Sequence, residues 1–196
     1  MSKTSSTNEK RRSLYGIVAV GLMSALVYVG NFMSIPLNYE TRIHLGNSMC
    51  LLAGLLFGGV SGGLSSGIGG ALYDLFNPLH TLSAPYTFFS KFAMGWTAGK
   101  LNRSGIKSEL ARAFTAAICG QIVYIILYLV KAFAEQLILG NPVETAASVM
   151  ITKASASLIN GGLAVVISVP LYFALKKALK ALGFAYMMEG KPESRG

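Results

Sequence analysis

The sequence has little charge and little of the chemistry that metal and redox sites need. Of its 196 residues, 13% are Asp, Glu, Lys or Arg, against about 25% in a typical soluble domain. The two cysteines, Cys50 and Cys119, lie far apart in apolar runs, and there are two histidines, so no spacing typical of a disulfide or a metal site occurs. The G-x-x-x-x-G-K-[ST] motif is absent, so the sequence carries no P-loop for ATP.

Apolar residues dominate instead. They make up 53% of the chain, the mean hydropathy is +0.53, and the net charge is +9, from 17 basic and 8 acidic residues. A basic balance is also typical of nucleic-acid-binding proteins, but here the charges gather at the two ends and in one central loop. Long apolar runs with basic flanks are typical of membrane proteins. The sequence therefore predicts a multi-pass protein of the cell membrane, partnered by the lipid bilayer and not by nucleic acid.

Six apolar segments predict an all-α membrane protein with six transmembrane helices in a compact bundle. The first is long enough to cross the hydrocarbon core, which takes about 20 residues, and no small-residue cleavage site follows a short core, so we expect it to be retained. The second is short and is expected to tilt or to begin in the polar loop before it. The predicted helices are 13–33, 46–57, 63–76, 86–101, 110–139 and 145–182, with a polar loop at 34–45 and a tight turn at Gly58–Gly62.

An even number of helices places both termini on one side of the membrane. The basic termini and the loop from Lys100 to Lys107 then share a face, and the positive-inside rule assigns this face to the cytoplasm. We expect a disordered basic cytoplasmic tail at 1–12, a transmembrane domain at 13–182 and a second cytoplasmic tail at 183–196.

The stretch from Gly46 to Phe76 is almost wholly apolar or small. Glycine costs about 1 kcal/mol relative to alanine within a helix, but small residues four apart let membrane helices approach closely. Two such rows predict a closely packed helix pair: one contains Gly54, Gly58 and Gly62, and the other Gly59, Gly63, Gly67 and Ala71.

One catalytic signature occurs and is rejected. Residues 63–67 match G-x-S-x-G, whose serine needs a preceding strand and a later acid and histidine. Here the motif lies in a predicted helix, and His80 is expected on the opposite side of the membrane. We therefore expect no catalytic residue and no enzyme activity.

Charged residues at membrane depth are costly and usually mark a substrate path or an internal pair. In the predicted topology they gather in the outer half, close to amide, hydroxyl and tyrosine side chains. A pocket with aromatic walls and a few polar anchors suits a small, planar, polar ligand. The charged residues are Arg42, Asp74, Lys91, Lys131, Glu135 and Lys153, joined by Asn160, Ser155, Ser157, Tyr73, Tyr86, Tyr124 and Tyr128.

Each of these residues also has a purely structural interpretation. Lys131 and Glu135 are four apart on one helix, which favours an ion pair between them. Lys91 and Lys153 lie where lysines snorkel to the headgroups, and Asp74 can cap its helix or pair with Lys91. Tyrosines near helix ends often form an interfacial belt. The prediction of a site rests on the clustering of the residues on one side.

The motifs of residues 42–101 resemble those of the substrate-binding S components of energy-coupling factor (ECF) transporters. Leu45-Gly46-Asn47 resembles the L-G-[DN] entry to the second helix, and Gly58–Gly62 the G-x-x-x-G turn. The glycine-to-aspartate end of the third helix is similar at Gly70–Asp74, and the K-x-x-M-G-x-x-A-G pattern of the fourth at Lys91–Gly99. The motifs occur in the family's order.

The resemblance implies a six-helix fold whose pocket lies near the extracellular side, capped by the loop between the first two helices. It implies that residues 13–182 bind a vitamin or related micronutrient and deliver it to the cytoplasm with a T component and two ATPases. ATP is used by those ATPases, and this chain is expected to bind no cofactor or metal. Basic residues outnumber acids in the outer cluster, which favours an anionic or carbonyl-rich ligand. The implied substrate-binding residues are Tyr39, Glu40, Arg42, Asp74, Tyr86, Lys91, Tyr128, Lys131, Lys153 and Asn160.

In such proteins small residues on the first helix, usually A-x-x-x-A, contact the T component. The nearest equivalent is Gly21-x-x-x-Ala25, with Ile17 one turn earlier. Glycine also permits close helix approach, and the alternative is a seam within the bundle. An alternative function is a self-sufficient secondary transporter or channel for a small polar solute. That function requires carboxylates near the midplane for ion coupling, of which the sequence has few.

Overall fold

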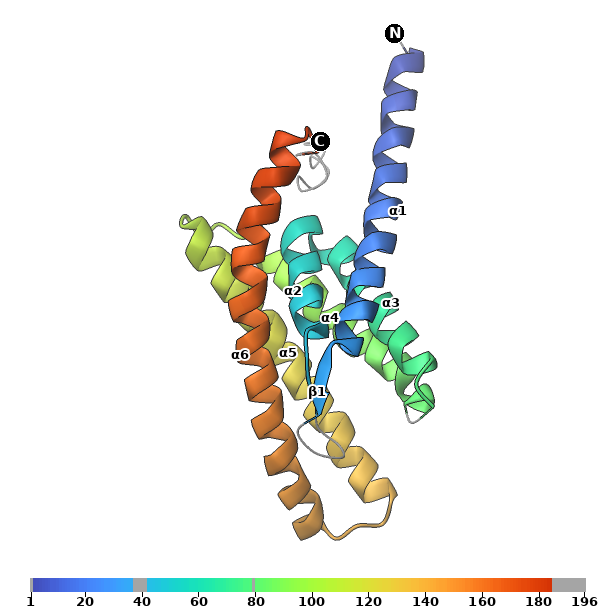
Figure 1. Cartoon of the computed structure of the whole chain (residues 1–196), viewed down its shortest axis with the longest axis vertical. Coiled ribbons are helices and arrows are strands. Elements are labelled where there is room, and N and C mark those ends of the chain that lie inside the picture. Colours follow the sequence, from blue (N-terminus) through green and yellow to red (C-terminus); the bar gives the residue numbers. More distant parts are fainter. Residues whose placement is uncertain (1, 37–41, 79, 185–196) are drawn as a thin grey trace.

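The computed structural model describes residues 2–36, 42–78 and 80–184. In this part of the chain six α-helices form the fold, with one short pair of strands and one 3-10 turn (Figure 1). Three helical segments are long and apolar enough to cross a membrane: Leu14–Phe32, Glu109–Ile138 and Val143–Ala181. The elements are α1 (Ser2–Phe32), β1 (Ser34–Pro36), β2 (Arg42–His44), α2 (Gly46–Phe57), α3 (Gly59–Leu75), η1 (Thr81–Ser83), α4 (Ala84–Leu101), α5 (Glu109–Ile138) and α6 (Val143–Ala181).

The short helix α2 lies at the centre and contacts each of the other five helices. Most of its residues are buried, and its leucines form the hydrophobic core together with Met94 and Val27. A helix of this length, 12 residues, rises only about 18 Å, while the hydrocarbon core is about 30 Å thick. Because protein surrounds α2 on all sides, it packs within the bundle without spanning the bilayer alone.

The two ends of the bundle are distinct. In Figure 1, α1 begins and α6 ends at the top of the view, while the strands and the α5–α6 loop lie lower down. The strands β1 and β2 form an antiparallel pair in which Ser34 faces His44 and Ile35 faces Ile43. The strand pair therefore joins α1 to α2 at the end of the bundle opposite the start of α1.

Glycines bring α2, α3 and α4 into backbone contact, as the glycine rows predict. A Cβ atom placed on Gly54 would lie 2.4 Å from the carbonyl oxygen of Gly95. A Cβ atom on Gly99 would lie 2.2 Å from the carbonyl carbon of Gly58. Both approaches are far inside van der Waals contact and involve backbone atoms, so neither neighbour can move aside cheaply. The close helix packing predicted for this stretch is confirmed.

The turn inside this stretch is shorter than the sequence indicates. The prediction places it at Gly58–Gly62, but α2 ends at Phe57 and α3 begins at Gly59, with only Gly58 between them. Gly58 has φ of +86°, a region that glycine enters without a steric penalty. Gly62 lies within α3, where a Cβ atom would lie 2.4 Å from the Cα atom of Gly54. Its glycine thus permits helix contact and does not make the turn.

Two further expectations differ from the structure. The helix α1 begins at Ser2, so it includes most of residues 1–12, the predicted disordered tail. This segment contains Lys, Glu and Arg and neither glycine nor proline, a composition that favours helix. The segment 34–45, predicted as an irregular polar loop in an all-α protein, forms β1 and β2 at its ends.

Candidate functional site

A cavity of about 490 Å³ lies at the strand end of the bundle. Every helix contributes to it: the ends of α1 and α3, the starts of α2 and α4, and the adjoining halves of α5 and α6. Its walls are mainly polar and aromatic. The residues that line it are Asn31, Ser34, His44, Asn47, Gly70, Tyr73, Asp74, His80, Ser83, Tyr86, Thr87, Ser90, Lys91, Tyr124, Tyr128, Lys131, Glu135, Lys153, Ala156, Ser157 and Asn160.

Most of the residues predicted to bind substrate meet in this cavity. Tyr39 and Glu40 lie outside the described residues, and Arg42 is part of β2. The predicted residues that line the cavity are Asp74, Tyr86, Lys91, Tyr128, Lys131, Lys153 and Asn160. The structure thus brings together side chains from α3, α4, α5 and α6 that are up to 86 positions apart in the sequence, from Asp74 to Asn160.

The ammonium group of Lys91 is buried where α1, α2 and α4 converge. Its side chain is 3% exposed, and Nζ donates a hydrogen bond to Oδ1 of Asn31 at 3.0 Å. The stem of Lys91 lies against Gly70, where a Cβ atom would be 2.4 Å from the lysine Cδ. The snorkelling interpretation is therefore wrong for Lys91. Among the described residues, no carboxylate forms an ion pair with it.

Two neighbouring groups have unused hydrogen-bonding capacity. Oδ1 of Asn47 and Nδ1 of His44 are buried without a hydrogen-bond partner. Burial, and secondarily the charge of Lys91, lower the pKa of His44 to about 3, so its imidazole is neutral at physiological pH. The backbone N–H of His44 donates to Oδ1 of Asn160 at 3.0 Å, which fastens β2 to α6 beside the cavity.

The polar groups around Lys131 in the cavity wall already have partners within the protein. Lys131 forms an ion pair with Glu135 at 2.8 Å, which confirms the predicted pair. Its Nζ also donates to Oγ of Ser83 at 2.9 Å and lies 5.9 Å from the centre of the Tyr86 ring. The Tyr86 hydroxyl in turn donates to the carbonyl oxygen of Leu127. These contacts position Lys131 and leave fewer of its N–H donors available to a ligand.

Asp74 is held by the start of α4. The hydroxyl of Thr87 donates to its Oδ2 at 2.5 Å, and Asp74 neither caps α3 with its side chain nor pairs with Lys91 among the described contacts. On α5 the rings of Tyr124 and Tyr128 stack with centroids 6.1 Å apart. Nζ of Lys91 lies 6.0 Å from the centre of the Tyr124 ring. A stacked pair of tyrosines thus lies close to the buried lysine in the cavity lining.

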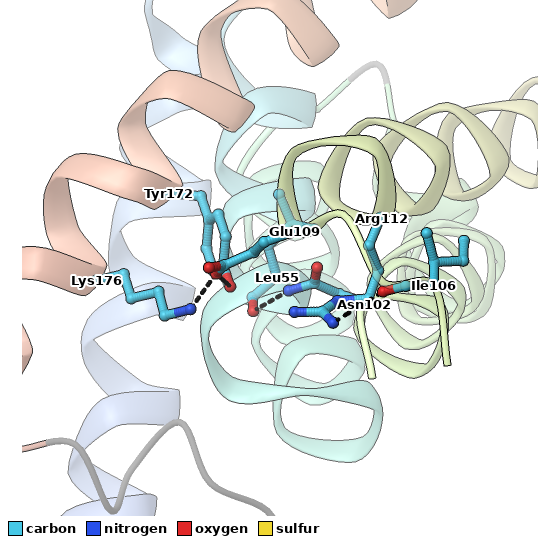
Figure 2. A network of polar contacts seen from close by, with 7 residues as sticks. All are labelled: Leu55, Asn102, Ile106, Glu109, Arg112, Tyr172 and Lys176. Atoms are coloured by element: carbon cyan, nitrogen blue, oxygen red, sulfur yellow. Dashed lines mark hydrogen bonds and ion pairs between the residues drawn. The ribbon is translucent and has the colours of Figure 1, made fainter. Parts of the chain in front are cut away.

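A second polar cluster lies at the other end of α5 (Figure 2). Glu109 accepts hydrogen bonds from the Tyr172 hydroxyl, at 3.1 Å, and from Nζ of Lys176, with which it also forms an ion pair. Nδ2 of Asn102 donates to the carbonyl oxygen of Leu55 at 2.9 Å. These contacts join the start of α5 to α6, and the end of α4 to α2. Glu109 and Tyr128 are separated by roughly 30 Å along α5, at 1.5 Å per residue.

The residues predicted to contact a T component lie on the outer side of α1. Ile17 is 67% exposed, and Gly21 and Ala25 are exposed as well. The seam of α1 with α3 is formed instead by Ser24 and Val27, which lie against Gly69. The interpretation of Ile17, Gly21 and Ala25 as an internal seam is therefore wrong.

The sequence prediction missed Asn31, His44 and Asn47 as site residues. Asn31 stands at the end of the apolar segment of α1, and Asn47 at the start of α2 within the Leu45-Gly46-Asn47 motif. An amide at the edge of an apolar segment is a signal for a polar site, and it was available in the sequence. Their convergence on Lys91 depends on three helices meeting, which no local pattern shows.

Comparisons with known proteins agree on this architecture. A family model described as "ECF-type riboflavin transporter, S component" matches residues 11–177. No curated protein matches the sequence. The fold is similar to a solved structure of the S component of a bacterial ECF transporter, with a TM-score of 0.68 and 19% sequence identity over 86% of this chain and 99% of that chain. At this identity the structural match shows a shared fold, and the family match spans most of the sequence.

Proposed function

The chain belongs to the family of ECF-type riboflavin transporter S components, and on this premise we propose that it captures a vitamin-sized molecule in the cavity at its strand end. One observation carries the proposal: a membrane protein encloses a cavity of about 490 Å³ with polar and aromatic walls. Cavities of this size suit small ligands. The family description prints riboflavin, so we propose a vitamin or a related micronutrient as the ligand.

We propose that the cavity opens to the extracellular side and that both termini face the cytoplasm. The support is the charge distribution: α1 begins and α6 ends at one end of the bundle (Figure 1), and both segments carry clusters of Lys and Arg. Basic segments beside membrane helices remain in the cytoplasm. The cavity lies at the other end, where a nutrient would arrive.

The proposed partners are a T component and two ATPases, which would supply the ATP hydrolysis that this chain has no P-loop to perform. The exposed, apolar side of α1 is the surface we propose for the T component, with Ile17, Gly21 and Ala25 at its centre. Glycine and alanine one turn apart allow a second helix to pack closely. Within the described part of the bundle, no atom lies within 4 Å of a Cβ placed on Gly21.

Purification of the full chain in mild detergent tests the proposal. We expect it to retain a small molecule that native mass spectrometry identifies, and to copurify with a T component and two ATPases when these are coexpressed. Riboflavin binding is read from the quenching of flavin fluorescence. Substrate uptake by proteoliposomes that contain this chain alone would contradict the proposal and support the self-sufficient transporter instead.

A further inference from the structure

The buried ammonium group of Lys91 has no counter-ion within the described part of the protein. Its one hydrogen-bond partner is the neutral side chain of Asn31, at 3.0 Å, and its side chain is 3% exposed. Burying an ammonium group without a paired charge is costly. The group lies on the wall of a cavity, so a molecule in the cavity can supply the missing charge.

The charged groups among the described lining residues do not supply it. These residues include three lysines and two carboxylates, which is an excess of positive charge. The carboxylate of Glu135 is engaged by Lys131 at 2.8 Å. The carboxylate of Asp74 accepts from Thr87 and forms no described ion pair with Lys91. His44 is neutral and adds no negative charge.

A second feature lines the same cavity as Lys91, namely Asn47. Asn31, whose Oδ1 accepts from Lys91, packs against Gly46, the residue before Asn47. Oδ1 of Asn47 is buried without a partner among the described residues, so it can accept a hydrogen bond from a ligand. Unpartnered buried amide atoms also occur outside the cavity, at Asn102 and Gln121, so Asn47 is informative because it lines the same cavity as Lys91.

We propose that the molecule bound in this cavity is an anion whose carboxylate or phosphate pairs with Lys91 and whose neighbouring N–H or O–H group donates to Asn47. The inference rests on the proposed function and specifies the class of its substrate. It separates this chain from a binder of riboflavin itself, which is uncharged at neutral pH. A ring attached to the anionic group would lie against Tyr124 and Tyr128.

Matched pairs of neutral and anionic molecules test the inference on the purified full chain. The pairs are nicotinamide with nicotinate for a carboxylate, and riboflavin with riboflavin 5′-phosphate and pyridoxine with pyridoxine 5′-phosphate for a phosphate. Equilibrium dialysis gives each Kd. We expect the anionic member of at least one pair to bind about tenfold or more tightly than its neutral partner, as a charge-assisted hydrogen bond gives. Lys91→Gln should remove this preference, and Lys91→Arg should keep it.

Lys100→Gln is the matched control, because it removes the same charge from the other end of α4, outside the cavity, and should leave the preference intact. Equal or tighter binding of the neutral members would overturn the inference, as would a preference that survives Lys91→Gln. If that variant does not fold, the wild-type comparison decides alone. If no probe binds, the molecule that copurifies decides by its charge: an anion supports the inference and a neutral molecule overturns it. A chain that neither binds a probe nor retains a molecule contradicts the proposed function, and the inference falls with it.

Discussion

The two polar clusters of this bundle differ in how their lysines are satisfied. At the far end, Lys176 meets the carboxylate of Glu109, and the Tyr172 hydroxyl joins them. At the cavity end, Lys91 is more deeply buried, and its hydrogen-bond partner among the described residues is the amide of Asn31. A charge paired within the protein fastens helices together. A buried charge left unpaired beside a cavity has no such structural use, and this difference supports the proposal that the cavity binds a ligand.

The largest effect is expected between the two clusters, where glycines hold the helices in register. Gly99→Ala should lower the free energy of unfolding by about 1–3 kcal/mol, because its Cβ atom would lie 2.2 Å from the backbone of Gly58. Gly162→Ala in α6 is the control: nothing lies within 4 Å of its Cβ, so the gain in helix propensity should hold or raise stability by up to about 1 kcal/mol. Thermal unfolding in detergent measures both. Equal midpoints for the two variants would contradict the close packing.

The next prediction compares two asparagines from opposite ends of the bundle, Asn47 in the cavity and Asn102 in the second polar cluster. Asn47→Leu should weaken the binding of the copurified molecule about tenfold, the loss of roughly one hydrogen bond made by the ligand, because its Oδ1 has no partner among the described residues. Asn102→Leu should leave binding unchanged and lower stability by about 1 kcal/mol, because its hydrogen bond to Leu55 is lost. Calorimetric titration and thermal unfolding separate the two outcomes. Weaker binding by Asn102→Leu together with unchanged binding by Asn47→Leu would contradict the proposed location of the binding site in the cavity.

A smaller effect is expected when one carboxylate is neutralised at each end. Glu109→Gln should cost about 0.5 kcal/mol of stability, since its ion pair with Lys176 is partly exposed, and should not change ligand affinity. Asp74→Asn removes a negative charge from the cavity and should raise the affinity for an anionic probe several-fold. The two Kd values, measured against wild type at one salt concentration, check this. Weaker anion binding by Asp74→Asn would show that Asp74 itself holds the ligand.

The last prediction concerns pH. The pKa of His44 is lowered to about 3 in the folded protein, against about 6.5 when unfolded. Between these values the unfolded chain binds more protons than the folded one, so stability should fall as the pH is lowered from 6.5 toward 3. Other groups titrate in the same range, so the measured quantity is the difference between wild type and His44→Gln in the slope of the unfolding midpoint against pH. Identical slopes would show that His44 is accessible to protons when folded.

The helices and many of the cavity-lining residues were predictable. Their signals are either local patterns in the sequence or a clustering of charged residues on one side of the predicted membrane topology. Apolar length marked the helices, four-residue spacing marked the Lys131–Glu135 pair, and the charges of Asp74 and Lys91 were conspicuous in apolar surroundings. The short turn at Gly58 was not predictable, because a glycine that permits helix contact and a glycine that makes a turn look alike in sequence. Only the positions of the facing residues on α2 and α4 distinguish them.

The three polar cavity residues that the sequence prediction missed were not predictable for a different reason. Asn31, His44 and Asn47 come from α1, β2 and α2 and become one site only when α4 brings Lys91 among them. The strand pair that carries His44 is held partly by Asn160, which is 116 positions away in the sequence. Contacts over such separations leave no periodic pattern in a single sequence.

The central position of α2 has a consequence for how the chain enters the bilayer. At 12 residues α2 is too short to be a stable membrane segment by itself, since about 20 apolar residues are needed. Only Gly58 separates it from α3, so we expect the two helices to enter the bilayer together as a hairpin. In the folded bundle α2 packs against all five other helices, so its place in the membrane depends on the whole bundle.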